Sequence, residues 1–245
     1  KSFTATDSEG FDAVRKGLVN QAYEVRDLNL VTEGKIPASC SAIAIWGGTK
    51  GWFPQEIPLV RDYLAGGGRA LAALDVDLKG DEPAGPLLAV LSAWNVAPRK
   101  AMIVDPFSRV LNLDPSVVIL PTFSKDSAIT KDFSTNAVMP FARPIEILPG
   151  APAGLNVRWL ARTTPKAWGE TSFKDLAAGR VQQDSQDKPG PIDTVVEVEG
   201  RLKDSKAPRN TRLVVFGSSS FANNNFSRLY GNADLFLNEI GRAHV

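Results

Sequence analysis

The chain has 245 residues, 43% of them hydrophobic, which is enough for one large domain or two small ones with a sizeable core. Lysine and arginine total 28 against 27 acidic residues, and no basic run occurs, so the composition argues against nucleic-acid binding. A single cysteine, Cys40, excludes a disulfide framework and a cysteine-based zinc site. No apolar run reaches the length of about 18 residues that a spanning helix needs. Because the chain also lacks a starting methionine and a signal peptide, we expect a soluble segment of a longer protein.

Strand and helix patterns alternate through the first half of the chain. The expected elements are a short strand at 3–6, a helix beginning near residue 8, a strand at 24–30, a buried strand at 42–46, a helix at 55–65, a buried strand at 70–75, a helix at 87–94 and short strands at 102–104 and 117–120. The glycines at 66–68 end the helix at 55–65, as glycine does at helix C-termini. Alternation at this spacing is typical of βαβ units with a parallel sheet.

The second half of the chain is less regular until residue 192. Residues 121–191 contain scattered proline and glycine, with strands expected only near 144–148 and 157–161. From Val196 onward, apolar and charged residues alternate as in a half-exposed strand. The run Leu213–Phe216 is apolar and is ended by Gly217, which predicts a strand buried on both faces. A helix then follows, with Asn232 or Asp234 as its N-cap.

Together these patterns predict an α/β fold of three layers, with a mostly parallel sheet and some antiparallel edge strands. We assign residues 1–120 and 192–245 to an α/β sandwich core. Residues 121–191 form a loop-rich insertion or a peripheral subdomain packed on that core.

Polar residues follow three of the predicted strands, and ligands of open α/β sheets bind at the carboxyl ends of the strands. Aromatic side chains beside short polar groups suit the stacking of a sugar or a peptide, although aromatic residues at such places also pack as lids or core. The candidate ligand- or partner-binding residues are Gly47, Gly48, Trp52, Asp75, Ser218 and Ser219.

Nucleophilic catalysis has little support in the sequence. The segment Gly217–Phe221 lacks the second glycine of a G-x-S-x-G nucleophile elbow. The only histidine, His244, lies in the last five residues, so a Ser-His or Cys-His pair would depend on it alone. Gly47–Gly51 does not have the spacing of a phosphate-binding loop. We therefore expect no catalytic residues, no cofactor and no enzyme activity of this type.

An acidic segment at 75–82 resembles a calcium-binding loop only in part. Lys79 stands where an oxygen ligand is needed, and Pro86 stands where the bidentate glutamate should be. Asp75, Asp77 and Asp81 are therefore weak metal candidates, and a solvated polar loop is the default interpretation.

Four ordered stretches resemble the gliding-motility-type auxiliary component of ABC transporters. They are residues 55–75, Thr163–Trp168, residues 188–200, and Arg212–Phe221 with 231–238. Where many members of that family have a Gly-His-Gly-Glu-like turn after the first strand, this chain has Asp7, Ser8, Glu9 and Gly10, so a role for that histidine is not carried over.

The resemblance implies a flavodoxin-like or glutamine-amidotransferase-like fold, related also to intraflagellar transport proteins. It further implies a non-catalytic extracytoplasmic domain that is membrane-anchored in the full-length protein and works with an ABC permease and an ATPase. Two alternatives stay open: a periplasmic glycan- or peptide-binding module that is independent of transport, and an enzyme of unknown type that depends on a metal held by the three aspartates.

Overall fold

A computed structural model describes residues 2–47 and 51–243, with side chains described up to residue 238. The helices are α1 (Asp12–Asn20), α2 (Leu30–Glu33), α3 (Glu56–Ala65), α4 (Gly85–Ala93), α5 (Phe173–Ala177) and α6 (Asn232–Ala243), with 3-10 helices η1 (Pro106–Leu111) and η2 (Ser220–Ala222). The strands are β1 (Ile43–Gly47), β2 (Arg69–Leu74), β3 (Val96–Pro98), β4 (Met102–Val104), β5 (Val117–Leu120), β6 (Thr122–Phe123), β7 (Ala137–Pro140), β8 (Ile145–Ile147), β9 (Leu155–Arg162), β10 (Trp168–Glu170), β11 (Lys188–Pro189), β12 (Asp193–Gly200) and β13 (Thr211–Phe216).

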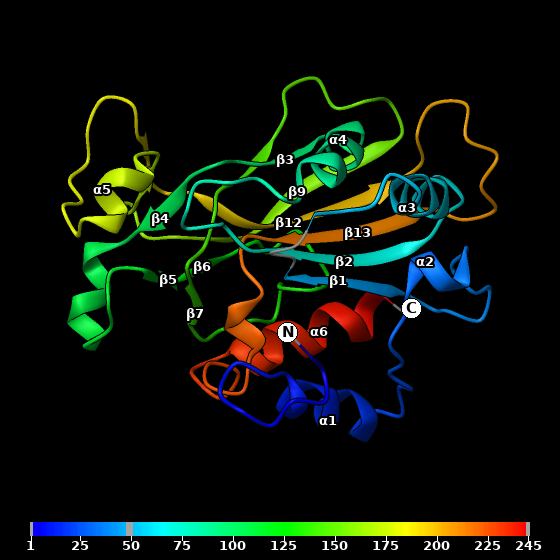
Figure 1. The fold of residues 1–245 in the computed structure, drawn as a ribbon, viewed down its shortest axis with the longest axis horizontal. Helices are drawn as coiled ribbons and strands as arrows, with labels where there is room; N and C mark the ends of the chain where they lie inside the picture. The colour runs from blue at the N-terminus through cyan, green and yellow to red at the C-terminus, as the bar shows by residue number, and fades with distance from the viewer. Residues whose placement is uncertain (1, 48–50, 244–245) are drawn as a thin grey trace.

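The main sheet has six strands in the order β1-β2-β13-β12-β9-β6. β1, β2 and β13 run parallel to one another, whereas the pairs β13–β12, β12–β9 and β9–β6 are antiparallel. The sheet is therefore mixed: one half is parallel, as expected, and the other half is antiparallel. Helices α3 and α4 lie on one side of it, and α1 and α6 lie on the other (Figure 1).

Alternation along the central strands builds a hydrophobic core on each face of the sheet. In β2, Leu71 and Ala73 pack with α1 and α6, whereas Ala72 and Leu74 pack with α3 and α4. The predicted run in β13 divides between the two cores in the same way and is buried throughout. β13 is thus a strand buried on both faces, as its apolar run predicts.

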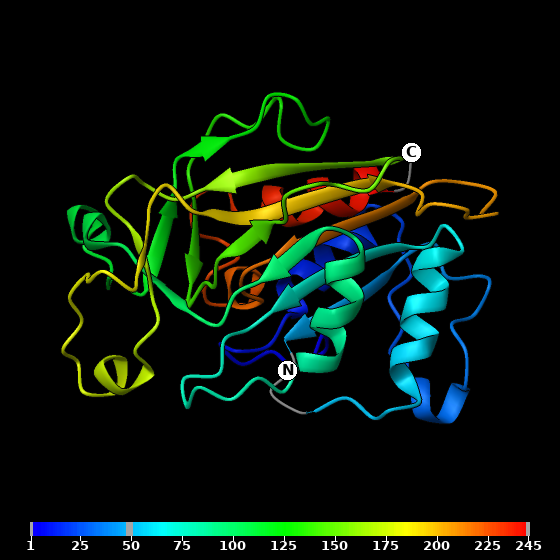
Figure 2. The same ribbon diagram turned by 90° about the horizontal axis from the view of Figure 1, so that it is seen from above.

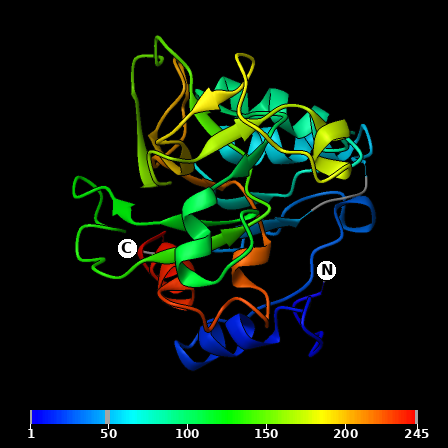
Figure 3. The same cartoon turned by 90° about the vertical axis from the view of Figure 1, so that its left-hand side faces the viewer.

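Only one of the expected βαβ units closes within the main sheet. The unit β1–α3–β2 does so, and the parallel pairing of β1 with β2 confirms it. Helix α4 leads instead to β3, which pairs antiparallel with β8 outside the main sheet. β4 and β5, also expected as strands, belong to small antiparallel sheets with β10–β11 and β7. These two small sheets, η1 and α5 gather at one end of the main sheet, on the left of Figure 1 and toward the viewer in Figure 3.

Two expected strands are wrong. Residues 3–6 form turns and coil, and the ring of Phe3 stacks on Phe11 at 5.5 Å. Residues 24–29 are coil that leads into α2. The apolar side chains of this second segment divide between the two cores, with Tyr23 and Val25 on the α1 side and Leu28 on the α3 side. The segment therefore passes from one face of the sheet to the other, and this path produces the alternation that resembles a strand.

The segment 121–191 contributes β6 and β9 to the main sheet. β9 pairs with β12 from Leu155 to Arg162, so a part of the chain expected in an insertion or a peripheral subdomain lies within the principal sheet. The strands expected near 144–148 and 157–161 are confirmed as β8 and β9. β12 is more buried than a half-exposed strand, because Val196 and Val198 are fully enclosed and Glu197 is only 9% exposed.

The helix starts also depend on long-range contacts. α1 begins at Asp12, and the side-chain oxygen of Asn224 accepts a hydrogen bond from the amide of Ala13 at 2.9 Å. Ser8, the expected cap, lies three residues before the actual N-cap, Phe11. α6 begins at Asn232, so neither Asn232 nor Asp234 is its N-cap, and Gly231 precedes the helix instead. There the fully buried Asn232 accepts from the amide of Val138 at 2.8 Å and donates to two carbonyls of the 221–226 turn, each at 3.0 Å.

Candidate functional site

Asp75 and two serines meet where β2 and β13 end, as the strand order predicts. The amide of Ser219 donates to Asp75 Oδ1 at 2.6 Å, and the Ser219 hydroxyl donates to Asp75 Oδ2 at 2.9 Å. The Ser218 oxygen lies 3.5 Å from Asp75 Oδ1 and accepts from the amide of Ser220 at 3.1 Å. Asp75 thus closes the turn after β13 by pairing with its donor groups.

The serines of this polar cluster are buried, whereas Asp75 is partly exposed. Ser218 and Ser219 are fully buried, and Ser220 is 7% exposed. The turn also lies against another part of the backbone, since a Cβ on Gly217 would come within 2.3 Å of the Arg143 carbonyl oxygen. A buried hydroxyl bonded to a carboxylate stabilises a turn but is not presented to a substrate.

Of the other predicted residues, Gly47 lies beside this cluster, because it pairs with Leu74, the residue before Asp75. Gly47 ends β1 with a φ of 80°, a left-handed conformation that favours glycine. Gly48 and His244 lie outside the described residues. Trp52 packs, partly buried, against the core on the α3 side, and Phe53 beside it is 58% exposed.

Trp46 is partly buried and packs against the core on the α1 side. Its ring has phenylalanine centroids at 5.3 to 6.2 Å, namely those of Phe3, Phe11, Phe216, Phe221 and Phe236. Edge and tilted contacts of this kind are favourable packing for aromatic side chains. The ring therefore takes part in aromatic packing, and the side chain as a whole stays partly exposed.

The acidic segment after β2 does not gather its aspartates into a metal site. Asp77 Oδ1 accepts from the amide of Lys79 at 2.8 Å, which forms a local turn, and Asp81 is exposed. No cluster of three or more metal-ligating side chains occurs within the described residues. Glu82 instead binds Arg143 through two hydrogen bonds of 3.1 and 2.5 Å. Arg143, wholly buried, also donates to the carbonyl of Arg99 at 2.9 Å.

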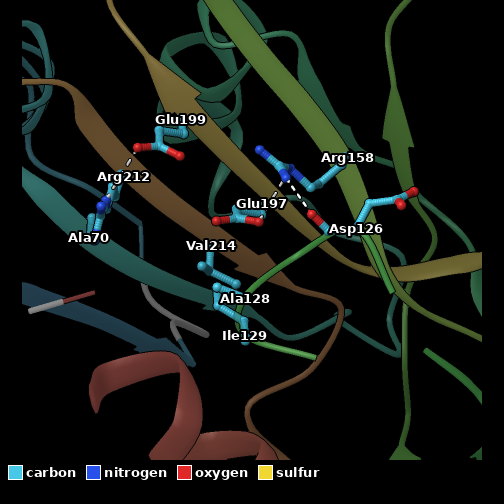
Figure 4. A pocket seen from close by; sticks show the side chains of 9 residues that line it. All are labelled: Ala70, Asp126, Ala128, Ile129, Arg158, Glu197, Glu199, Arg212 and Val214. Carbon is cyan, nitrogen blue, oxygen red and sulfur yellow. Dashed lines mark hydrogen bonds and ion pairs between the residues drawn. The ribbon is translucent and has the colours of Figure 1, made fainter. Parts of the chain in front are cut away.

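A second candidate site lies at the opposite end of the parallel strands, on the face of the sheet that also carries α6. It is a hollow of about 260 Å³, which we call the charged hollow; its lining is Ala70, Asp126, Ala128, Ile129, Arg158, Glu197, Glu199, Arg212 and Val214 (Figure 4). Arg158 lies 3.4 Å from Glu197, and Arg212 lies 3.5 Å from Glu199. Its lining of paired arginines and carboxylates differs from that of a typical apolar ligand pocket.

The charged residues that line this hollow were not predicted from the sequence. One sequence pattern could have indicated two of them. In β12, Glu197 and Glu199 alternate with Val196 and Val198, so the two glutamates face the same side of the sheet. Their arginine partners come from β9 and β13, and the pairing of those strands with β12 could not be read from the sequence.

Two of the stretches on which the family resemblance rests interlock around a buried carboxyl. The amide of Ile192 donates to the Thr163 hydroxyl at 3.0 Å, and the amide of Gly190 donates to the carbonyl of Ala167 at 2.7 Å. The Thr164 hydroxyl donates to Oδ1 of the fully buried Asp105 at 3.0 Å. These stretches therefore have a packing role.

Burial raises the pKa of Asp105, against the opposing effects of the Phe107 amide, the Thr164 hydroxyl and the Ile119 amide. Oδ2 of this carboxyl has no hydrogen-bond partner of normal geometry among the described residues. A carboxylate that is only partly paired in a low-dielectric interior is costly in its charged form.

A family model described as an ABC-type uncharacterized transport system matches residues 5–239. The chain belongs to this family. It is an auxiliary component of an ABC transport system, and the match extends from the first turn to α6, so the resemblance seen in the sequence is confirmed. No curated protein matches the chain.

The fold of this ABC transport auxiliary protein is similar to the solved structure of the mmIFT52 N-terminal domain. The TM-score is 0.66 at 11% identity, and the similarity covers 99% of this chain and 93% of that chain. At this identity the likeness concerns the fold alone, and it agrees with the expected relation to intraflagellar transport proteins. Within the described residues, no helix is both long and apolar enough to cross a bilayer.

Proposed function

We propose that this chain serves its ABC transport system as a non-catalytic accessory domain, which works with the permease and the ATPase and which docks to transporter partners or contacts the transported substrate. The observation that supports this proposal is the burial of the two serines that meet Asp75 at the ends of β2 and β13. Enzymes of open α/β architecture present reactive groups at this edge. Here Ser218 and Ser219 are fully buried, and Ser219 is bonded to Asp75 through both its amide and its hydroxyl.

The test of this proposal separates a structural serine from a reactive one in the full-length protein. Ser218→Ala and Ser219→Ala are introduced singly, and transport, copurification of the permease and ATPase, and thermal stability are measured for each. We expect copurification and transport to persist wherever the protein stays folded. Ser220→Ala is the matched control, because Ser220 lies in the same buried turn. Transport lost in Ser219→Ala, with stability and copurification intact, would contradict the proposal.

We also propose that the domain lies outside the cytoplasm, held there by anchoring segments of the full-length protein. The support for this placement is the resemblance to the gliding-motility-type family. A single cysteine simplifies the test, since Cys40→Ser leaves this domain free of thiols. Lys203→Cys then places one thiol in an exposed loop. We expect a membrane-impermeant maleimide to label intact cells, and labelling only after lysis would contradict the placement.

A further inference from the structure

Three arginines converge at the end of the main sheet where β2 and β13 begin. Arg69 and Arg212 are directly paired in the parallel register of these strands, so their side chains leave the sheet on the same face. Arg209, in the loop before β13, donates from Nε to the carbonyl of Gly67 at 2.9 Å, two residues before Arg69. In Figures 1 and 2 this loop, in orange, projects at the right-hand end of the sheet. The fold thus gathers positive charge that is scattered along the sequence.

Two of these three cations have no carboxylate partner among the described residues. Arg212 lies 3.5 Å from Glu199, whereas no described carboxylate pairs with Arg69 or Arg209. Nε of Arg69 is enclosed and has no hydrogen-bond partner in the described part of the chain. Burial lowers the pKa of Arg69, and the nearby charges of Arg209 and Arg212 lower it further. A guanidinium that is partly removed from water without a counter-charge is costly, and like charges on neighbouring strands add to that cost.

The charged hollow opens beside these arginines. Arg212 lines it from β13, and Figure 4 shows Arg212 next to Ala70 of β2, away from the pair of Arg158 and Glu197. The strand order places Arg212 between Glu199 of β12 and Arg69 of β2. An anion held by the two arginines would therefore lie on the side of Arg212 that faces away from Glu199.

We propose that Arg69 and Arg212, with Arg209 beside them, bind a phosphate group where β2 and β13 begin. Guanidinium groups bind phosphate oxygens through parallel hydrogen bonds, and this geometry is not available to lysine. Arg69 and Arg209 bring two positive charges without a carboxylate partner, which matches the charge of about −2 that a phosphate monoester has near neutral pH. The proposal does not depend on the proposed function.

The first test is a titration of the nitrogen-15-labelled chain with sodium phosphate, followed by NMR of the arginine Nε–H signals. Sodium chloride of equal ionic strength is the reference. We expect the signals of Arg69 and Arg212 to shift and to saturate in phosphate, whereas the signal of Arg180 should not shift. Arg180 is an exposed residue in the loop after α5, at the other end of the main sheet.

Arg69→Lys separates a guanidinium site from a general effect of charge. This variant keeps the positive charge, and we expect the Kd for phosphate, read from the Arg212 signal, to rise about tenfold or more. Arg180→Lys is the matched control and should leave that Kd unchanged. Shifts no larger in phosphate than in chloride would overturn the proposal, and so would an unchanged Kd in Arg69→Lys.

The second test measures thermal unfolding of the wild type and of Arg69→Met. In chloride the variant should melt at the temperature of the wild type or above it, because it lacks a cation that has no partner. Phosphate stabilises folded proteins in general, so the evidence is a larger rise in Tm for the wild type than for the variant. Equal rises would refute the site. A variant that melts well below the wild type in chloride would also contradict the proposal, since Arg69 would then already have a stabilising partner.

Two further ligands define the chemistry of the site. Acetate at the same ionic strength should bind more weakly than phosphate, and equal binding of acetate would refute the selection of phosphate. Glycerol phosphate is then compared with inorganic phosphate. Tighter binding of inorganic phosphate assigns the site to the free ion, whereas equal or tighter binding of glycerol phosphate assigns it to a phosphate ester; both results support a phosphate site.

Discussion

The buried ion pair of Arg143 and Glu82 gives the sharpest prediction from this structure. The Arg143 side chain is 0% exposed and the Glu82 side chain is 24% exposed. Removal of one partner of a buried pair leaves the other charge uncompensated, at a cost of about 3–5 kcal/mol. The two single substitutions should therefore destabilise the protein by different amounts. The Glu82 carboxylate can be hydrated when Arg143 is lost, whereas the buried Arg143 guanidinium cannot be hydrated when Glu82 is lost.

We expect Glu82→Ala to lower the free energy of unfolding by about 3–5 kcal/mol. Arg143→Met keeps most of the buried volume and should cost about 1–3 kcal/mol, chiefly from lost hydrogen bonds. Urea denaturation at constant pH measures both, and a loss of 3–5 kcal/mol corresponds to a fall of about 1–2 M in the midpoint for a slope near the upper end of the usual range.

The double variant Glu82→Ala, Arg143→Met completes a double-mutant cycle for this pair. It should be more stable than Glu82→Ala alone, because no unpaired cation remains buried. The reasoning is wrong if Arg143→Met proves the more destabilising single change, or if the double variant loses the sum of the two single effects.

Three further changes test the buried polar groups. Asn232→Leu should lower the unfolding free energy by about 3–5 kcal/mol, since one amide and two carbonyls lose their partner; a loss below about 1 kcal/mol in urea denaturation would contradict this. Asp75→Ala should lower the unfolding free energy by about 2–3 kcal/mol, because it removes the acceptor of two hydrogen bonds from Ser219. Ser219→Ala keeps the hydrogen bond from the backbone amide and should lower it by about 1 kcal/mol in the same assay. Because the folded-state pKa of Asp105 is raised, this carboxyl should add stability as the pH falls from 7 toward its ordinary pKa of 3.8. Thermal unfolding across that range should show the stability of the wild type rising relative to Asp105→Asn, and an unchanged difference would show that Asp105 does not contribute to the pH dependence.

The parallel half of the sheet could be predicted because its strands are short apolar runs bounded by glycine. β2 and β13 are buried on both faces, and their adjacency brings Asp75 to Ser219, as expected from the ends of neighbouring strands. The burial of Ser218 and Ser219 could not be predicted, since the turn that carries them lies against the Arg143 backbone, which is far away in sequence.

The antiparallel half was harder to predict for a physical reason. A strand was expected near 157–161, but its place in the main sheet was not, because Arg158 and Arg162 are paired with Glu197 and Asp193 of β12 and this pairing cannot be read from the sequence. The charged hollow depends on the same pairing. The segment at 24–30 alternates apolar and charged residues but forms no strand. Its apolar side chains contact two different cores, and this arrangement gives the same alternating pattern as the two faces of a single strand.

The crossing of residues 23–30 from one face of the sheet to the other has a consequence for cooperativity. Tyr23 and Val25 complete the layer that holds α1, and Leu28 and Leu30 complete the layer that holds α3. Neither layer can then be fully packed while the other is open, since both share one short stretch of chain. Proteolytic cleavage within this stretch should loosen both helical layers at once, and the two should melt together in the intact protein.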